Sequence, residues 1–391
     1  MTIHRFSFPT AIHFGAGAAG TVGPHLAELG KRRPLVVTDR ALARLPVATG
    51  FVAALKEAGL DVAVYDGVHG NPTVSQANAG GAAFRAHRAD CVVGFGGGAA
   101  LDVAKIVGVL GTHDGDALEF AWDHPSVRAI RDDLPYFVAL PTTAGTGSEV
   151  GRSAVISEDD THVKRIVFSP KILARAVFAD PELTLGLPPG ITAATGMDAL
   201  THNVESYLSP AYHPLCDGIA LEGVRIAARA LPVAVGDGAN LAARSDMLMS
   251  SMMGAIAFQK DLGAVHSCAH ALSTVADLHH GLANGVMIDH VMRFNLPEAT
   301  ARMAELARVA GVRGAAAMGD EAAAAAFVDW LVRLKAELGI PARLSGLAGP
   351  RRPTAADLPA LVAIAERDLC HQTNPRPCTA ADFERLFAAA L

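Results

Sequence analysis

The sequence changes character at one proline- and glycine-rich segment, Leu185–Ile191 (LGLPPGI). Before this segment, short apolar runs rich in β-branched residues alternate with helix-like stretches. After it, alanine, leucine and methionine dominate, and strand-like runs nearly disappear. Prolines and glycines in this arrangement are typical of a joint between structural elements. Because 391 residues are enough for two domains, we expect one domain over residues 1–187 and an all-helical one over residues 188–391.

Four short apolar runs in the first part are typical of buried strands: Pro34–Asp39, Asp61–Tyr65, Asp90–Phe95 and Tyr136–Leu140. Helix-like segments lie between them, as at Phe51–Ala58. Strands and helices that alternate at this spacing predict a mostly parallel sheet in an α/β domain. Such sheets bind ligands at the carboxyl ends of their strands.

Composition and charge exclude several classes of protein. The chain is 51% hydrophobic and 18% charged, so it can bury a large core. Its net charge is −6 without a basic block, which argues against nucleic acid or an anionic membrane as partner. We find neither a signal peptide nor a membrane span. The five scattered cysteines form no CxxC pair, so we expect a reducing, cytoplasmic location.

Two loops of small residues indicate a phosphate-bearing cofactor. Gly94–Lys105 follows a predicted strand and opens a helix, so its glycines and free N–H groups can approach a phosphate. This segment is not the GxGxxG fingerprint, and alone it could be only a tight turn. Pro141–Glu149 forms a second such loop, and Asp39 ends the first clear strand. An acidic side chain there binds an adenosine ribose and repels a 2′-phosphate, which favours NAD over NADP.

Acidic and histidine side chains in the second part are spaced as metal ligands. Asp198 and His202 are four residues apart at what reads as a helix start, so they project from one face. His266 and His270 repeat that spacing, and His280 follows. A single helical histidine is more often a surface or core residue. Together, a carboxylate and imidazoles suit a borderline divalent ion such as Fe²⁺ or Zn²⁺.

Many stretches of the chain match one known family, in the family's order. They are Val37–Asp39, Asn71–Thr73, Gly96–Gly98 with Asp102 and Lys105, Pro141–Glu149, Asp180–Thr184, Ala194–His202, His266 with His270, His280–Asn284 and Asn374–Arg376. The chain therefore resembles the iron-containing (group III) alcohol dehydrogenases, of the lactaldehyde reductase and 1,3-propanediol dehydrogenase type, over essentially its full length.

The resemblance implies a fold and a set of binding residues. The fold is an α/β N-terminal dinucleotide-binding domain plus an all-α C-terminal domain, also seen in dehydroquinate synthase, with the active site in the cleft between them. The implied metal ligands, for Fe²⁺ or alternatively Zn²⁺, are Asp198, His202, His266 and His280. The implied NAD contacts are Asp39, Asn71, Gly97, Gly98, Asp102, Thr142, Thr143 and Lys164.

His270 occupies the place of a family histidine that is linked with proton transfer. Its imidazole either relays the alcohol proton or only orients a metal ligand through a hydrogen bond. The chain departs from the family at Ala99, where serine is usual, and at His279, which precedes the last ligand and competes with it. Because His280 has the matching position, we keep His280 as the ligand.

These features together predict an enzyme that transfers a hydride between NAD(H) and an alcohol or aldehyde. A divalent metal would stabilise the alkoxide during oxidation and polarise the carbonyl during reduction. Two alternatives remain. One is a lyase like dehydroquinate synthase, which needs many basic residues around a phosphorylated acid. The other is a non-catalytic metal-binding role, in which the loops and ligands are idle. The family commonly forms homodimers or larger homo-oligomers.

The substrate end of the implied cleft differs from that of the small-alcohol enzymes. By alignment it contains Arg152, Ser153, Lys260 and Cys370. The two cations would suit an acidic tail, as in 4-hydroxybutyrate or succinic semialdehyde. Alternatively, they pair with Asp261 or contact the cofactor phosphates. Cys370 is equally well explained as an inert buried thiol.

Overall fold

The computed structural model describes residues 6–347 and 351–391, which form two compact units. One unit contains the described residues up to Thr143 together with Gly147–Thr184. The other contains Ala144–Thr146 and the described residues from Leu185 onward. The second unit therefore begins inside the segment where the sequence changes character. The sequence gives no sign that Ala144–Thr146 packs with this second unit.

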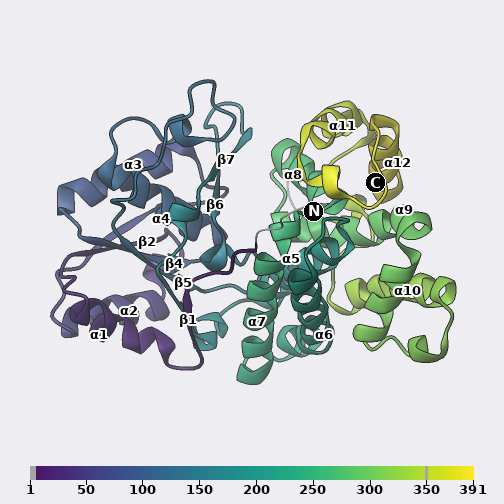
Figure 1. Cartoon of the computed structure of the whole chain (residues 1–391), viewed down its shortest axis with the longest axis horizontal. Coiled ribbons are helices and arrows are strands. Elements are labelled where there is room, and N and C mark those ends of the chain that lie inside the picture. Colours follow the sequence, from purple (N-terminus) through teal and green to yellow (C-terminus); the bar gives the residue numbers. More distant parts are fainter. Residues whose placement is uncertain (1–5, 348–350) are drawn as a thin grey trace, which may run out of the picture. The chain divides into compact units, whose positions relative to one another are not determined.

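The first unit is built on a six-stranded parallel sheet, drawn in purple to teal in Figure 1. The strand order is β1-β8-β5-β4-β2-β3, and each neighbouring pair is parallel. All four predicted strands are present. The strands are β1 (Ala11–Phe14), β2 (Pro34–Asp39), β3 (Ala63–Val68), β4 (Cys91–Gly96), β5 (Tyr136–Pro141) and β8 (Ala176–Ala179).

Helices cover both faces of the sheet. On one face, α1 (Val22–Glu28) and α2 (Pro46–Glu57) form a core with alternate residues of β4, such as Val93 and Phe95. On the other face, α4 (Gly98–Thr112) approaches β4 closely, since a Cβ at Gly94 would lie 3.0 Å from the side chain of Ala104. The helix α3 (Val74–His87) packs beside α4. This layering is the predicted α/β architecture.

The parallel sheet is not the whole of the β structure. A two-stranded antiparallel sheet, β6 (Ser153–Ser157) with β7 (Lys164–Phe168), stands beside α4. The sequence prediction did not include it. The backbone N–H of Val155 donates to Asp102 on α4 at 3.0 Å, so a half-buried carboxylate fixes the pair to the rest of the unit.

The second unit consists of helices, green to yellow in Figure 1. The central helix, α5, is buried along most of its length. The α-helices are α5 (Pro189–Leu208), α6 (Pro214–Gly236), α7 (Leu241–Ala257), α8 (Ala264–Ala276), α9 (His280–Val309), α10 (Asp320–Glu337), α11 (Leu358–Arg367) and α12 (Ala380–Ala390).

One sequence prediction about α5 is wrong. The helix begins at Pro189, a residue that suits the first helical position because its φ is already helical and no N–H is lost. Asp198 and His202 therefore lie in the middle of a long buried helix rather than at a helix start. The shared face of the two side chains is unaffected, because it depends only on their spacing.

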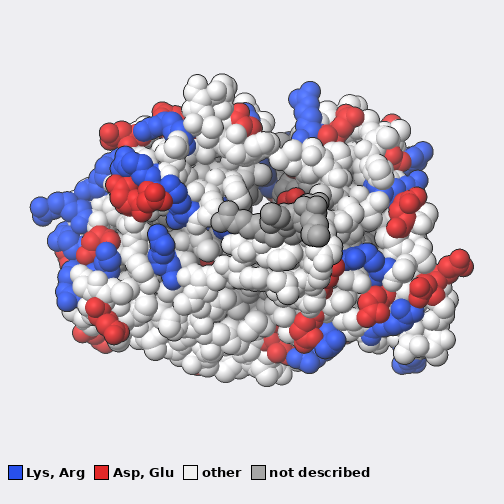
Figure 2. Space-filling model, viewed as in Figure 1, with Lys and Arg blue, Asp and Glu red and all other residues white. Residues whose placement is uncertain are grey.

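No helix in the described part of the chain is long and apolar enough to cross a membrane. On the face drawn in Figure 2, basic and acidic side chains lie next to one another in mixed groups, and much of the remaining surface is uncharged.

A buried ion pair between α9 and α10 gives a test of this packing. Lys335 donates to Asp289 and to the carbonyl of Val286 at 2.7 Å, and both charged side chains are buried. We expect Lys335→Met to lower the free energy of unfolding by about 3–5 kcal/mol, because it leaves a buried carboxylate unpaired. The control is Arg293→Ala, which removes an exposed pair of 3.7 Å and should cost less than about 1 kcal/mol. Equal losses in urea denaturation would contradict the prediction.

Candidate functional site

The middle of α5 presents one carboxylate and one imidazole to the interior of the helical unit. Asp198 and His202 are both buried, 2% and 5% exposed. The Nε2 atom of His202 lies 3.9 Å from Oδ1 of Asp198. Burial lowers the pKa of His202 to about 4, so its ring is neutral at neutral pH and has a lone pair free to bind a cation.

Two other helices add imidazoles to the same carboxylate oxygen. His266 on α8 places its Nε2 atom 3.8 Å from Oδ1 of Asp198, and its ring stacks on that of His202. His280, the first residue of α9, places its Nε2 atom 3.4 Å from the same oxygen. The ligand atoms of Asp198, His202 and His266 thus lie within 4.8 Å of one another, and the fourth predicted ligand, His280, approaches this group at Asp198.

The approach of α9 to α5 depends on a glycine. A Cβ at Gly281 would lie only 2.3 Å from the carbonyl oxygen of Ala194 on α5. Any side chain at this position would push the two helices apart and move the neighbouring His280 away from Asp198. The glycine next to the histidine is therefore a requirement of the site's geometry.

The donor set fits a divalent cation. Ligand atoms about 2.1 Å from a tetrahedral ion lie roughly 3.4 Å apart. The separations of the three histidine Nε2 atoms from Oδ1 of Asp198 range from 3.4 to 3.9 Å, close to that value. Three imidazoles and one carboxylate also leave a divalent ion with net positive charge, as a Lewis acid requires.

A carboxylate that the sequence analysis missed holds His266. Oε2 of Glu205 accepts a hydrogen bond from Nδ1 of His266 at 2.6 Å, and Oε1 accepts one from the N–H of Val265 at 2.7 Å. This bond fixes the proton on Nδ1, so that Nε2 faces Asp198 as a lone-pair donor. The signal was present in the sequence, because Glu205 lies two helical turns after Asp198 on the same face of α5.

A second unpredicted carboxylate holds His270. Oδ2 of Asp368 lies 2.7 Å from Nδ1 of His270, whose ring stacks on that of His280. The other oxygen of Asp368 accepts from Oγ of Ser267 at 2.7 Å and from the N–H of Cys370 at 2.9 Å. Burial by itself would raise the pKa of Asp368, but His270 and these hydrogen bonds hold it well below its usual range.

The structure distinguishes between residues that the sequence left as alternatives, first for the last metal ligand and then for the partner of Lys260. Nδ1 of His279 accepts from the N–H of Leu282 at 3.4 Å, so this ring caps α9 while His280 reaches Asp198. Lys260 is buried and bonded to Asp217, so its partner is Asp217 and not Asp261. With its ammonium group used in this way, Lys260 is removed from the substrate candidates. Cys370 is half-buried, and burial raises its thiol pKa, which agrees with an inert thiol.

The predicted cofactor residues lie in the α/β unit, mostly where strands end. Asp39 ends β2, and its Oδ1 accepts from the N–H groups of Ala41 and Leu42 at 3.0 and 2.8 Å. A Cβ at Gly97 would lie 3.3 Å from Oγ1 of Thr143, so the two small-residue loops touch. The other candidates follow β3, begin α4, follow β5 or begin β7: Asn71, Gly98, Thr142 and Lys164.

Asp102 is bonded to the protein itself. Its carboxylate accepts from Oγ of Ser148 at 2.6 Å and from the N–H of Val155, and it lies 3.5 Å from Nζ of Lys105. Lys105 is buried and also donates to Ser148 and to the carbonyl of Ser153. This network ties α4 to the end of the second loop and to β6. Arg152 directly precedes β6 and Ser153 begins it, and both residues are half-buried.

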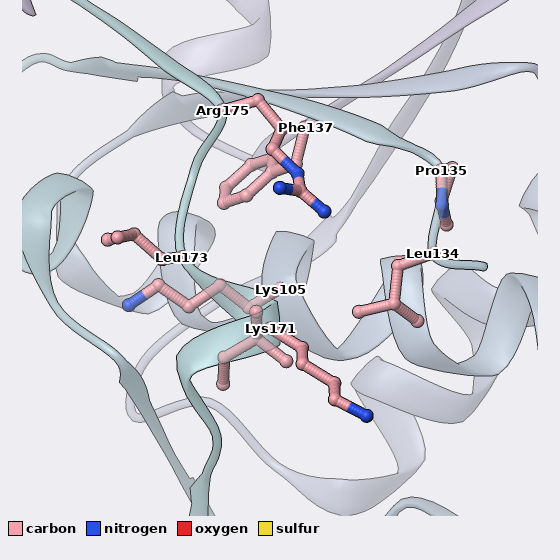
Figure 3. Close-up of a pocket in the computed structure, with 9 residues that line it drawn as sticks. Lys105, Leu134, Pro135, Phe137, Lys171, Leu173 and Arg175 are labelled. Atoms are coloured by element: carbon pink, nitrogen blue, oxygen red, sulfur yellow. The ribbon is translucent and has the colours of Figure 1, made fainter. Parts of the chain in front are cut away.

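A small crevice in the α/β unit is not the cofactor site. Figure 3 shows that basic and apolar side chains line it, among them Lys171, Arg175 and Phe137. Leu134 and Pro135 precede β5, and Arg175 precedes β8. The crevice therefore lies at the amino ends of the strands, whereas the loops described above lie at the carboxyl ends, where parallel sheets bind their ligands.

Comparison with known proteins matches both parts of the chain. Residues 9–181 match the family described as iron-containing alcohol dehydrogenase. Residues 192–391 match the C-terminal family of the Fe-containing alcohol dehydrogenases.

Three proteins that are similar to this chain act on different substrates, according to their names. The 4-hydroxybutyrate dehydrogenase of Cupriavidus necator is 39% identical, over 98% of each chain. The crystal structure of a 1,3-propanediol oxidoreductase is 35% identical with a TM-score of 0.94 and covers 100% of both chains. Sulfoacetaldehyde reductase from Bifidobacterium kashiwanohense, solved in complex with NAD⁺, is 27% identical with a TM-score of 0.88, over 100% of this chain and 99% of that one.

These matches confirm the predicted family, the fold and the class of activity, an NAD-dependent alcohol dehydrogenase. The family matches together span most of the sequence, in the same order as the two parts that the sequence predicts. The chain belongs to the iron-containing alcohol dehydrogenase family.

Proposed function

We propose that the chain transfers a hydride between NAD(H) and an alcohol or aldehyde at a divalent ion held by Asp198, His202, His266 and His280. One observation carries this proposal: three imidazoles from three helices converge on one buried carboxylate oxygen. When bound, the ion supplies the positive charge that stabilises an alkoxide or polarises a carbonyl. The family description favours Fe²⁺, although imidazole and carboxylate ligands also accept Zn²⁺.

The His270–Asp368 pair supports a role for His270 in proton transfer. Asp368 binds Nδ1 of His270 at 2.7 Å, so the ring keeps a proton there and its Nε2 is the basic atom. Nε2 then accepts the proton of the alcohol during oxidation and returns it during reduction. Asp368 touches neither substrate nor cofactor in this scheme. It is a positioning residue that holds the imidazole in one tautomer and orientation.

The α/β unit supports NAD as the cofactor. Its two small-residue loops touch at Gly97 and Thr143, and the start of α4 presents N–H groups there, as phosphates require. Asp39 at the end of β2 is placed for an adenosine ribose. The NAD⁺ complex of the sulfoacetaldehyde reductase, whose fold covers this whole chain, supports the same cofactor. Within this scheme Asp102 acts by bracing the loop through Ser148.

We propose 4-hydroxybutyrate and succinic semialdehyde as the substrate pair. Two of the similar proteins are named for compounds that carry an acidic group, 4-hydroxybutyrate and sulfoacetaldehyde. Because Lys260 is paired with Asp217, Arg152 is the remaining candidate cation for the substrate, and Ser153 and Cys370 remain the neutral candidates. A guanidinium can bind a carboxylate through two parallel hydrogen bonds.

The first test removes one proposed metal ligand. We expect His280→Ala to lose both its metal, measured by elemental analysis of the freshly purified protein, and its NAD-linked turnover of butanol. His290→Ala, on the same helix and half-buried, is the control and should retain both. A metal-stripped wild-type enzyme that is still fully active would overturn the proposed metal site, while NADH formation with a simple alcohol excludes a lyase.

The second test concerns cofactor choice. Asp39→Asn keeps an oxygen for the N–H groups of Ala41 and Leu42 but removes the negative charge. The lost repulsion of a 2′-phosphate is on the order of 1–4 kcal/mol, so kcat/KM with NADP should rise at least about fivefold. The control is Asp66→Asn, on the neighbouring strand β3, which should leave kcat/KM unchanged with both NAD and NADP. An unchanged NAD-to-NADP ratio in Asp39→Asn would remove Asp39 from the cofactor site.

The third test concerns the acidic tail. We expect Arg152→Ala to lower kcat/KM for 4-hydroxybutyrate about tenfold or more, as loss of a charged hydrogen bond does, and to leave butanol within about threefold. Arg175→Ala, at the opposite edge of the sheet, is the matched control and should leave kcat/KM unchanged for both substrates. Equal losses for both substrates in Arg152→Ala would show that Arg152 does not select the acid.

A further inference from the structure

One buried amide reaches three of the four proposed metal ligands. Asn284 lies on α9 one turn after His280 and is 0% exposed. Its Nδ2 atom lies 2.7 Å from Oδ1 of Asp198, 3.3 Å from Nε2 of His266 and 3.2 Å from Nε2 of His280. These are three of the four atoms proposed as metal donors. The amide therefore contacts the proposed site at its centre and not at its edge.

The other end of this amide is unsatisfied. Oδ1 of Asn284 is buried and has no hydrogen-bond partner among the described residues. A buried carbonyl oxygen without a donor costs about 1–3 kcal/mol. The oxygen and nitrogen of an amide have nearly the same shape and exchange places by a half-turn of the terminal torsion. Asn284 therefore has two orientations that fill the same space and differ only in charge.

The charge among the ligand atoms decides between these two orientations. When only lone pairs are present, the NH₂ group is favoured, since it is a donor facing three acceptors. A divalent cation held by the same atoms repels N–H and attracts a carbonyl oxygen. Carboxylate and carbonyl oxygens are established partners of divalent ions.

We propose that Asn284 is part of the metal site: without the ion, its Nδ2 holds Asp198, His266 and His280 together, and when the divalent ion binds, the amide turns its Oδ1 towards the ion. This inference rests on the metal site of the proposed function. It goes beyond that function by adding a fifth residue, which ties metal affinity to the orientation of a neutral amide.

Close packing of α9 against α5 restricts where the side chain of Asn284 can lie. Gly281 and Gly285 flank it on α9, and a Cβ at Gly285 would lie 3.4 Å from Cβ of Met197 on α5. At Gly281 the two helices are as close as glycine permits, since a Cβ there would lie 2.3 Å from the carbonyl oxygen of Ala194, and at Gly285 they are in van der Waals contact. A side chain at position 284 has to point into the site or force α9 away from α5.

The test compares two substitutions of nearly equal size. Asn284→Leu removes both polar ends, whereas Asn284→Asp keeps oxygens and removes the N–H donors. Metal-stripped proteins would be titrated with Zn²⁺ against a competing chelator, a readout that is independent of activity. We expect the leucine variant to bind Zn²⁺ 10–100-fold more weakly, and the aspartate variant to bind at least as tightly as wild type. The matched control is Asn295→Leu, since Asn295 is buried on the same helix and pairs with Asn374. Its Zn²⁺ affinity should stay unchanged.

The outcomes separate the two proposals. If the wild type itself binds neither Zn²⁺ nor Fe²⁺, both the proposed metal site and the proposed role of Asn284 are overturned. If the wild type binds and the leucine variant binds equally well, only the role of Asn284 is overturned. If both variants bind equally weakly, the amide only braces Asp198 through Nδ2, and the oxygen contact is refuted. A melting temperature that is lowered in the metal-stripped aspartate variant and restored by Zn²⁺ would be the further expected result.

Discussion

The buried carboxylate of Asp198 controls the chemistry of the helical unit. An ionised carboxylate inside a protein is costly unless a cation or several donors lie against it. Among the described residues, its neighbours are three imidazoles and the Asn284 amide, and no lysine or arginine pairs with it. Because burial keeps His202 neutral, its ring does not supply the missing charge. The arrangement is most stable when a divalent ion provides it.

That carboxylate is effective only because three helices bring their donors to it. The approach of α9 depends on Gly281, whose missing side chain lets the helix reach the backbone of α5. The ring of His266 is fixed by Glu205, which also binds the N–H of Val265 at the start of α8. Glu205 thus positions both the helix and the side chain that the helix carries. In this unit, the packing of the helices therefore determines the geometry of the donor atoms.

The sequence predicted the parts of the site that depend on local rules. The spacing of Asp198 and His202 places them on one helical face wherever the helix begins. The error about the start of the helix therefore did not affect the predicted pair of ligands. Four strands of the sheet were predicted, because short apolar runs report burial directly. The antiparallel pair β6–β7 was not, since its strands are short and partly polar.

The missed residues share one physical property: their role exists only after distant segments have packed. Asp368 meets His270 from 98 residues away, and Asn284 meets Asp198 from 86. Lys260 was predicted to bind substrate, with its sequence neighbour Asp261 as an alternative partner, yet α6 supplies Asp217. The α/β unit repeats the pattern, since Asp102 binds the loop that ends at Glu149 rather than lying free for a ligand. In both units, residues that touch a ligand have types and spacings that can be recognised, whereas the residues that hold them in place are revealed only by the packed structure.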